Sequence, residues 1–510
     1  NLLFYTNGKW IANSNHQMME NGNGLNPGDQ ASINGENSLK LPQGIVSLPV
    51  PNAPNLYQLI HAPYKIFSYP GYAEIRSFAL LSTTIDMEAN EGLGKVIAKN
   101  QVLIDNDSLA LGKMTATKHA NGRDWWLLCN RWRTDEYFTL LVSPEGIEVV
   151  DTQSVGTAII DGLAQAVFSP DGSKYVTINA DYSSYLQIFD FNRCTGQLSN
   201  ETLIIYPEEH YIYSPGVAIS PNSRFLYFSA MDTLYQYDLW EENIPSSEVI
   251  IDEWDGHIDP FPNTFYLAQL APDGKIYICP PNGSNYLHVI ENPNEKGVAC
   301  NFRQHAINLM NRNGFSMPNN PNYRLGPLDN SDCDTLGINN IPVAGFRYKQ
   351  DRLDYHKITF RNLSHHEPEQ WSWTFGDNSI SAEENPVHIF NADGIFDVCL
   401  TVHNQYGGDT HCKEIQLGLI SNYENVIEEY WSIFPNPASR YITIQNSEII
   451  RPKTILKIYN SLGILAKEIH LNKGINEQTI SLNELSDGIY FYQLFEAEKL
   501  IKSSKLILQK

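Results

Sequence analysis

A four-residue turn recurs along the first part of the chain at a fixed spacing. Ser-Pro-Asp-Gly occupies residues 169–172, Ser-Pro-Asn-Ser occupies 220–223 and Ala-Pro-Asp-Gly occupies 271–274, so that successive copies begin 51 residues apart. A looser copy, His-Ala-Asn-Gly, occupies 119–122. Proline presets φ at one turn position and Asp-Gly closes the turn, so each copy should join two strands. A repeat of this length holds about four strands, which must stack on neighbouring repeats to bury their faces.

The segments that follow these turns are predicted to be strands. Trp-Trp-Leu-Leu at 125–128 and Phe-Leu-Tyr-Phe at 225–228 are rich in the aromatic and branched residues that strands favour. The turn and strand pattern resembles the blades of WD-repeat-like β-propellers, in which four-stranded units surround a central axis. The resemblance implies an all-β fold for this part of the chain.

The divergent N-terminal region affects the blade count. Residues 1–50 and 51–110 are interpreted as two further blades, which gives six recognisable blades in all. Closure of the ring by native strands that precede Asn1 would give seven, the preferred count. The propeller is predicted to span residues 1–338.

Residues 343–418 carry a different pattern. The segments Trp-Ser-Trp-Thr-Phe-Gly-Asp-Asn at 371–378, Asn-Pro-Val-His-Ile-Phe at 385–390 and Gly-Ile-Phe-Asp-Val-Cys-Leu-Thr-Val at 394–402 alternate apolar and polar residues and are separated by turns. They resemble the polycystic-kidney-disease (PKD) domain, an immunoglobulin-like sandwich. Such domains often mediate contacts with proteins or carbohydrates.

Seven cysteines are present, and none forms a C-x-x-C pair. Cys399 and Cys412 flank the turn at 406–408 at similar distances from its tip, which predicts a disulfide between them. Cys300 and Cys333 are predicted to form a second disulfide. Both bridges require an oxidising compartment.

The last part of the chain, residues 432–510, resembles the type A sorting domain of the type IX secretion system, again a β-sandwich. A short acidic linker, residues 419–431, precedes it. Two prolines should hold the start of the domain extended, and an Asp-Gly turn precedes a strand with alternating tyrosines. The motif residues that we single out are Pro435, Asn436, Pro437, Gly488 and Tyr490.

This resemblance implies a route through the cell. The chain would pass the periplasm of a Bacteroidota-type bacterium, and the translocon would recognise residues 432–510 at the outer membrane. A sorting peptidase would then cut in the linker. The remainder would be secreted or held at the outer cell surface.

Charge excludes several classes of partner. Acidic residues outnumber basic ones by 58 to 35, and the net charge is −23. Nucleic acids and anionic membranes attract basic surfaces, so neither is an expected partner.

The sequence has no apolar run of transmembrane length and no signal peptide, so it is interpreted as a mature or trimmed form. No cofactor is expected. Calcium is the one metal left open, because residues 329–334 offer alternating oxygen ligands without the glycine and distal glutamate of an EF-hand.

One short stretch combines donors, a carboxylate and aromatic rings, as sugar-binding sites do. The alternative to a ligand site is that these residues form a blade turn followed by a buried aromatic strand. The residues of this candidate ligand site are His119, Arg123, Asp124, Trp125 and Trp126.

The sequence gives no catalytic motif, whether a nucleophile elbow, H-E-x-x-H, P-loop or G-x-G-x-x-G. No catalytic residue is therefore assigned, and the leading hypothesis is a non-catalytic module that binds a glycan or protein. One alternative is a propeller-type hydrolase or lyase acting on polysaccharide or protein, which would need paired carboxylates. The other is a structural component of an extracellular assembly.

Overall fold

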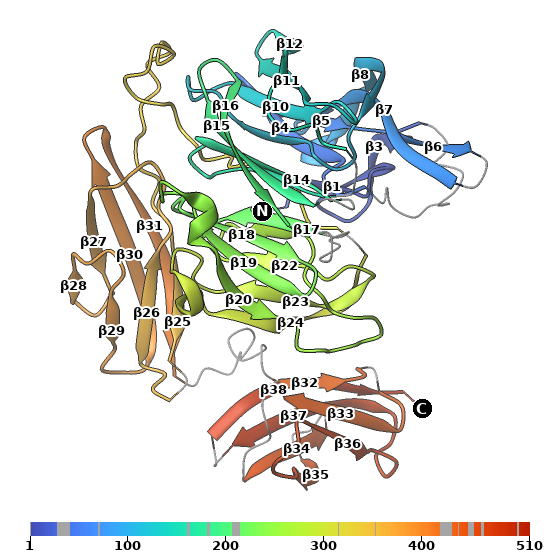
Figure 1. The fold of residues 1–510 in the computed structure, drawn as a ribbon. Coiled ribbons are helices and arrows are strands. Elements are labelled where there is room, and N and C mark those ends of the chain that lie inside the picture. Colours follow the sequence, from blue (N-terminus) through green and yellow to red (C-terminus); the bar gives the residue numbers. More distant parts are fainter. Residues whose placement is uncertain are drawn as a thin grey trace. The chain divides into compact units, whose positions relative to one another are not determined.

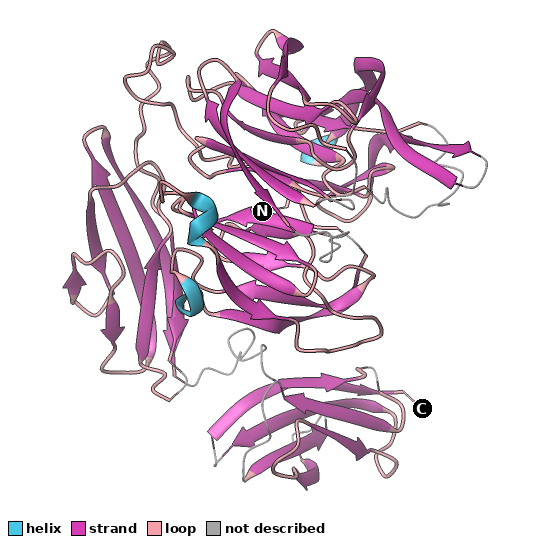
Figure 2. Cartoon of the chain, viewed as in Figure 1, coloured by secondary structure: helices cyan, strands magenta, loops and turns pink. Residues whose placement is uncertain are grey.

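The computed structural model of the protein describes all of its 510 residues except 1, 28–40, 70–71, 161–163, 181–183, 207–214, 315, 352, 419–430, 437, 447–452, 461–463, 497–498 and 510. The fold is all-β, with three short 3-10 helices η1 (Asn90–Gly92), η2 (Ile244–Ser247) and η3 (Gly297–Cys300) among the described residues (Figure 2). Two compact units result. The first contains residues 1–391 and 395–415, and the second contains 392–394 and 416–510.

Four sheets of the first unit have the same architecture (Figure 1). Each is a four-stranded antiparallel sheet whose strands pair in chain order, as the blades of a propeller do. Their strands are β9 (Thr115–Lys118), β10 (Trp125–Asn130), β11 (Glu136–Ser143) and β12 (Gly146–Ser154); β13 (Ala166–Phe168), β14 (Lys174–Asn179), β15 (Tyr185–Asn192) and β16 (Gln197–Ile205); β17 (Pro215–Ile219), β18 (Phe225–Ala230), β19 (Thr233–Asp238) and β20 (Val249–Glu253); and β21 (Ala268–Leu270), β22 (Ile276–Ile278), β23 (Ser284–Ile290) and β24 (Phe302–Asn313).

A larger sheet precedes these four. Its order is β1-β2-β3-β8-β7-β5-β4, with β6 paired to β7. The strands are β1 (Phe4–Thr6), β2 (Trp10–Asn13), β3 (Met18–Asn23), β4 (Ile45–Val50), β5 (Ala53–His61), β6 (Tyr64–Tyr69), β7 (Tyr72–Asp86) and β8 (Lys95–Leu109). Strands β4, β5, β7 and β8 form a blade, and β1–β3 extend its edge through a parallel bridge from Glu20 to Lys95. The described strands thus make five four-stranded blades and a three-stranded extension, instead of the six or seven blades predicted from the sequence.

The recurring turns join the first and second strands of a blade. At 169–172 the backbone N–H of Gly172 donates to the carbonyl of Ser169 at 2.8 Å, and Gly274 donates to Ala271 at 2.9 Å in the last blade. Gly172 and Gly274 have φ of 73° and 77°, a left-handed conformation that glycine adopts without a steric penalty. The repeated turn chemistry therefore has a direct geometric cause.

The first strands of successive blades lie side by side, with β13 in contact with both β9 and β17, and β17 in contact with β21. The buried side chain of Gln165 links three of these strands. Its Oε1 accepts from the backbone N–H groups of Val217 and Ala268, and its Nε2 donates to the carbonyl of Ala268. A polar side chain here satisfies backbone groups that have no sheet partner.

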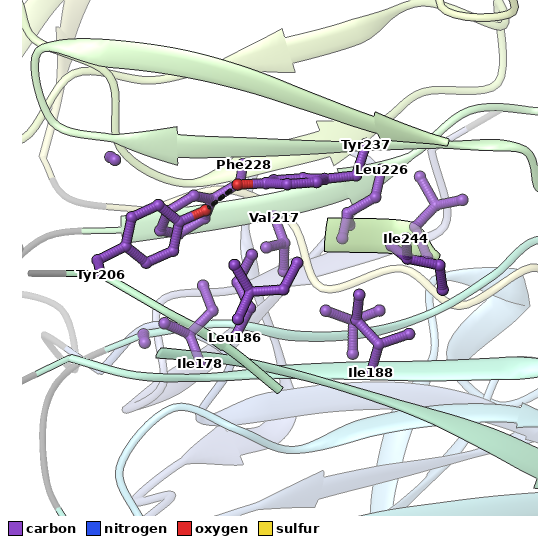
Figure 3. Close-up of a cluster of buried hydrophobic side chains, with 14 of the residues drawn as sticks. Ile178, Leu186, Ile188, Tyr206, Val217, Leu226, Phe228, Tyr237 and Ile244 are labelled. Carbon is purple, nitrogen blue, oxygen red and sulfur yellow. Dashed lines mark hydrogen bonds between the residues drawn. The ribbon is translucent and has the colours of Figure 1, made fainter. Parts of the chain in front are cut away.

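Apolar side chains of adjacent blades fill the space between their sheets. Figure 3 shows Ile178, Leu186 and Ile188 of one blade facing Val217 and Leu226 of the next. These side chains are at most 1% exposed. At the margin of the cluster the hydroxyl groups of Tyr206 and Tyr237 hydrogen-bond to each other (Figure 3), so their rings add apolar area without an unpaired polar tip.

An exit segment, residues 316–344, follows the last blade and returns to the earlier ones. Asn319 Nδ2 donates to the carbonyl oxygens of Ile45 at 3.0 Å and Met114 at 2.8 Å. Tyr323 donates its hydroxyl to the carbonyl of Ser47 at 2.8 Å. The segment therefore ties the end of the propeller to its first and second blades.

The PKD region forms two facing sheets, one of β25 (Phe346–Gln350), β26 (Lys357–Asn362) and β29 (Val387–Ile389). The other contains β28 (Ile380–Ser381), β27 (Gln370–Thr374), β30 (Gly394–Asn404) and β31 (Gly407–Leu417). Trp373 is fully buried, with its ring 5.0 Å from that of Phe346 and 5.2 Å from that of Phe360. The tryptophan of the sequence motif is thus the centre of this core.

The second unit is a two-sheet sandwich. One sheet contains β32 (Trp431–Phe434), β33 (Tyr441–Asn446) and β36 (Glu477–Ser481), and the other has the order β35 (Leu465–His470), β34 (Thr454–Asn460), β37 (Gly488–Glu496), β38 (Lys499–Leu508). Ile442, Leu456 and Leu506 are fully buried between them. In the described part of the chain no helix has the length and apolarity needed to cross a membrane.

Candidate functional site

The structure places the two tryptophans of the predicted ligand site in the propeller core. Trp125 is 0% exposed and Trp126 is 4% exposed, because both lie on the fully buried strand β10. Trp126 donates its indole N–H to the carbonyl of Arg193 at 2.7 Å. Neither ring offers a face to solvent, so the expectation that they stack on a ligand is corrected by their burial.

The polar members of the same stretch bond to one another. Arg123 forms a two-pronged ion pair with Asp124, with Nε at 2.7 Å from Oδ1, and Asn121 donates to Asp124 Oδ2 at 2.7 Å. His119 lies 5.2 Å from the Trp126 ring, and burial lowers its pKa. Burial also lowers the pKa of Lys118, to about 8. This cluster fixes the turn before β10, and its partly exposed members are Lys118, His119 and Arg123.

The disulfides follow the predictions in one case and depart from them in the other. Cys399 and Cys412 are bonded across β30 and β31, with their Cα atoms 4.1 Å apart. Cys333 pairs with Cys194 instead of Cys300, which is a buried free thiol in η3. The reason is the path of the exit segment, which brings Cys333 to the turn between β15 and β16.

The acidic run at 329–334 does not gather into a calcium cage. Within the run the Asn330 N–H donates to Asp334 at 3.3 Å, while Asp329 hydrogen-bonds with Tyr406 and Cys333 is bonded to Cys194. Among the described residues, three metal-ligand atoms come within 4.8 Å of one another only at Asp397, Cys399 and Cys412, where the disulfide occupies both sulfurs.

The last blade carries a group of aromatic and titratable side chains that was not predicted from the sequence. The imidazole rings of His257 and His305 lie 4.5 Å apart, and those of His288 and His305 lie 4.9 Å apart. Tyr286 contacts His257 edge-on at 5.4 Å, and Asp255 lies 3.2 Å from His305 Nε2. These five residues, which we call the histidine cluster, come from β23, β24 and the loop before β21. No fixed spacing in the sequence could have united them.

Burial sets the protonation of this cluster. It lowers the pKa of His288 to about 3, helped by the neighbouring His305, so His288 is neutral at physiological pH. Burial also lowers the pKa of His305, against the opposing effect of Asp255. For Asp255 burial acts upward, but hydrogen bonds from the His257 backbone and from His305 bring its pKa down overall. The cluster therefore combines the neutral imidazole of His288 with one carboxylate, that of Asp255.

A protruding loop, residues 254–264, borders the cluster. Ile258 is 61% exposed and Phe261 is 49% exposed, yet the loop is internally bonded. The N–H of Asp259 donates to the carbonyl of Phe261 at 3.0 Å, and that of Asn263 donates to His257 at 3.1 Å. Asn263 is fully buried, and neither of its side-chain amide atoms has a hydrogen-bond partner within the described part of the chain. Such an orphaned amide marks space for a ligand or an ordered water.

In the second unit, residues of the predicted sorting motif join the start of the domain to its last strand. Asn436 donates to the carbonyl of Lys505 at 2.6 Å and accepts from the N–H of Ile507 at 2.9 Å, so it fastens the start of the domain to β38. Pro435 follows β32 directly. Gly488 begins β37, and Tyr490 is buried with its hydroxyl donating to Ser486 at 3.1 Å. Pro437 lies outside the described residues.

Two domain families match the chain. A family described as the secretion system C-terminal sorting domain matches residues 432–509, and the PKD domain family matches residues 340–418. No curated protein matches the chain. Residues 432–509 therefore mark the protein for secretion through the outer membrane by the type IX system, to the cell surface or beyond, and imply contact with that machinery.

Solved structures similar to parts of the chain include the PKD1 domain of Vibrio anguillarum Epp. It shares 29% identity with 16% of this chain and 99% of its own length, at a TM-score of 0.15. A putative 6-phosphogluconolactonase from Bacteroides uniformis shares 10% identity over 84% of this chain and 100% of its own, at a TM-score of 0.29. Similarity at this level carries no inference about activity.

Proposed function

We propose that the protein is a type IX cargo whose propeller acts as a non-catalytic module that binds a glycan or a protein outside the cell. A sorting peptidase would release the C-terminal domain by cutting within residues 419–431. The binding surface in this proposal consists of the histidine cluster without the buried His288, together with the tip of the loop at 254–264; we call it the last-blade surface.

The observation that carries the proposal is the exposure of apolar side chains on an ordered loop. Ile258 and Phe261 project from a backbone held by its own hydrogen bonds, so little conformational entropy is lost when a partner covers them. Isolated exposed apolar residues are common on protein surfaces and need no partner. Here His257 of the same loop contacts Tyr286 and His305, which makes a mixed aromatic and polar surface.

The chemistry of the surface suits hydroxyl-rich or peptide ligands. The rings of Phe261 and Tyr286 offer apolar faces and edges for stacking. His257 and His305 can each donate or accept a hydrogen bond in the neutral form, and Asp255 accepts. Binding through one carboxylate and neutral donors requires no covalent step.

The test is a retention assay with the purified protein against a panel of polysaccharides and peptides, with and without calcium, with products scored in the same samples. Phe261→Ala should weaken retention by roughly tenfold, since central aromatic residues dominate interface energies. Trp240→Ala is the matched control, because Trp240 is 64% exposed but lies after β19 in another blade. Equal loss in both variants would contradict the assigned surface. Release of ligand fragments would contradict the non-catalytic role and favour the hydrolase or lyase alternative.

A further inference from the structure

The outward face of the four-stranded sheet β35-β34-β37-β38 departs from the usual pattern of an antiparallel sheet. Such a sheet normally has one buried apolar face and one polar face toward water. On β37 the inward side chains of Tyr490 and Tyr492 are buried, as expected. The outward side chains of Ile489 and Phe491 are apolar too, and they are 50% and 48% exposed.

The strand register extends this apolar surface across the sheet. Phe491 pairs with Tyr459 on β34 and with Lys505 on β38, and Tyr459 pairs with Leu465 on β35. Leu465 is 46% exposed. Residues paired directly across strands lie on the same face, so these four side chains form one row. Ile489 and Ile507 pair in a second row beside it.

The other sheet of the same domain provides an internal comparison. The outward positions of β33 are Tyr441, Thr443 and Gln445. They pair with Ser481, Thr479 and Glu477 on β36. That face is polar apart from two rings, that of Tyr441 and that of Phe434 on β32, which pairs with Thr443 and is 43% exposed. Its other cross-strand pairs are polar, whereas on the outward face of β35-β34-β37-β38 apolar residues pair with one another, as Phe491 does with Tyr459 and Ile489 with Ile507.

We infer that the outward face of β35-β34-β37-β38 is the surface by which the sorting domain docks on the outer-membrane component of the type IX machinery. The inference rests on the export route shown by the domain match and is independent of the ligand proposed for the propeller. A large apolar patch on a small domain typically marks a protein interface. The family match identifies the partner class, because selection for secretion is the task of this domain.

Charge specifies the partner further. Residues 432–510 contain ten basic and seven acidic residues, whereas the rest of the chain contains 25 basic and 51 acidic residues. An apolar receptor surface with an acidic rim would attract the sorting domain and repel the acidic cargo that precedes it. Lys505 lies in the exposed row beside Phe491, where it can meet such a rim.

The experiment uses the full chain in a bacterium with a type IX system. The double variant Ile489→Ser/Phe491→Ser should lower the amount of protein at the cell surface by roughly tenfold and raise the periplasmic amount. Tyr441→Ser, on the other sheet of the domain and 53% exposed in the native protein, should leave export unchanged. Limited proteolysis of the periplasmic form checks that the sorting domain remains folded. Normal export of the folded double variant would overturn the inference.

A second variant covers the case in which the double variant unfolds. Lys505→Glu keeps the apolar row and reverses the charge beside it, so it should also reduce export. Lys473→Glu, at an exposed turn between β35 and β36, is its control and should be exported normally. Export of Lys505→Glu at the native level would overturn the inference. So would a patch that serves only to join two copies of the chain, seen as dimers lost in the double variant with export intact.

Discussion

Mild acid should loosen the N-terminal extension β1–β3 from the first blade. His61 on β5 is fully buried, and its Nδ1 lies 2.7 Å from Asn26 Oδ1 while its Nε2 lies 2.9 Å from Thr83 Oγ1. Asn26 in turn donates to the carbonyl of Gly8, and Thr83 Oγ1 accepts from the N–H of Asn100. This series of hydrogen bonds joins the extension to strands of the blade. It is satisfied with His61 neutral and its proton on Nδ1.

The magnitude follows from the pKa of His61, which burial lowers from 6.5 to about 4. A histidine whose pKa is depressed in the folded state contributes stability that is fully present above pH 6.5. That stability is lost as pH falls through 6.5 toward 4, because the opened state then binds a proton that the folded state does not. At pH 5 the loss is about 2 kcal/mol, and it approaches about 3 kcal/mol below pH 4.

Hydrogen exchange of the amides in β1–β3 measures this effect. After correction for the intrinsic exchange rate, protection should fall by roughly thirtyfold between pH 7 and pH 5, the equivalent of about 2 kcal/mol. His61→Gln should remove most of this pH dependence. His16→Gln, at an exposed turn of the same extension, should retain it. Protection that does not change with pH in the native protein would refute the reasoning, as would an equal decline in His61→Gln.

Three further perturbations test the structure. Gln165→Leu leaves buried backbone N–H groups of β17 and β21 without an acceptor, and the free energy of unfolding should fall by about 2–4 kcal/mol in a urea titration; no change would show that water replaces the amide. Trp125→Ala should cost about 3–5 kcal/mol in the same assay, because it empties a fully buried site, and a loss below 1 kcal/mol would contradict its place in the core. Cys333→Ser should make the exit segment sensitive to protease and add one free thiol, from Cys194, on titration of the denatured protein; unchanged digestion would mean that the hydrogen bonds of the segment hold it without the disulfide.

The sequence predicted the structural features that depend on interactions between residues near one another in the chain. The repeated turns, the alternating strands and the hairpin between Cys399 and Cys412 depend on residues near one another in the chain, and the structure has each of them. The PKD and sorting regions were predicted for the same reason, because their motifs are short and fixed in spacing.

Long-range relations were not predictable in this way. The partner of Cys333 depends on where the exit segment travels after β24, and no residue near Cys333 records that path. The histidine cluster brings together residues 255–257, 286–288 and 305 from separate strands and a loop. For the Trp pair at 125–126 the sequence left a ligand site and a buried strand both open, because whether an aromatic residue faces solvent or core depends on the neighbouring blade.

The exit segment also bears on the order in which the chain acquires its structure. Asn319 bonds to the carbonyl of Ile45, 274 residues earlier, and Tyr323 reaches Ser47 across 276 residues. Contacts of such sequence separation carry a large loop-closure entropy and form late. A nascent or partly translocated propeller that lacks residues 319–333 therefore has its blades but not the long-range hydrogen bonds and the disulfide of the exit segment. The Cys194–Cys333 disulfide spans 139 residues, so we expect it to form as late as these hydrogen bonds and to hold the exit segment covalently once it has formed.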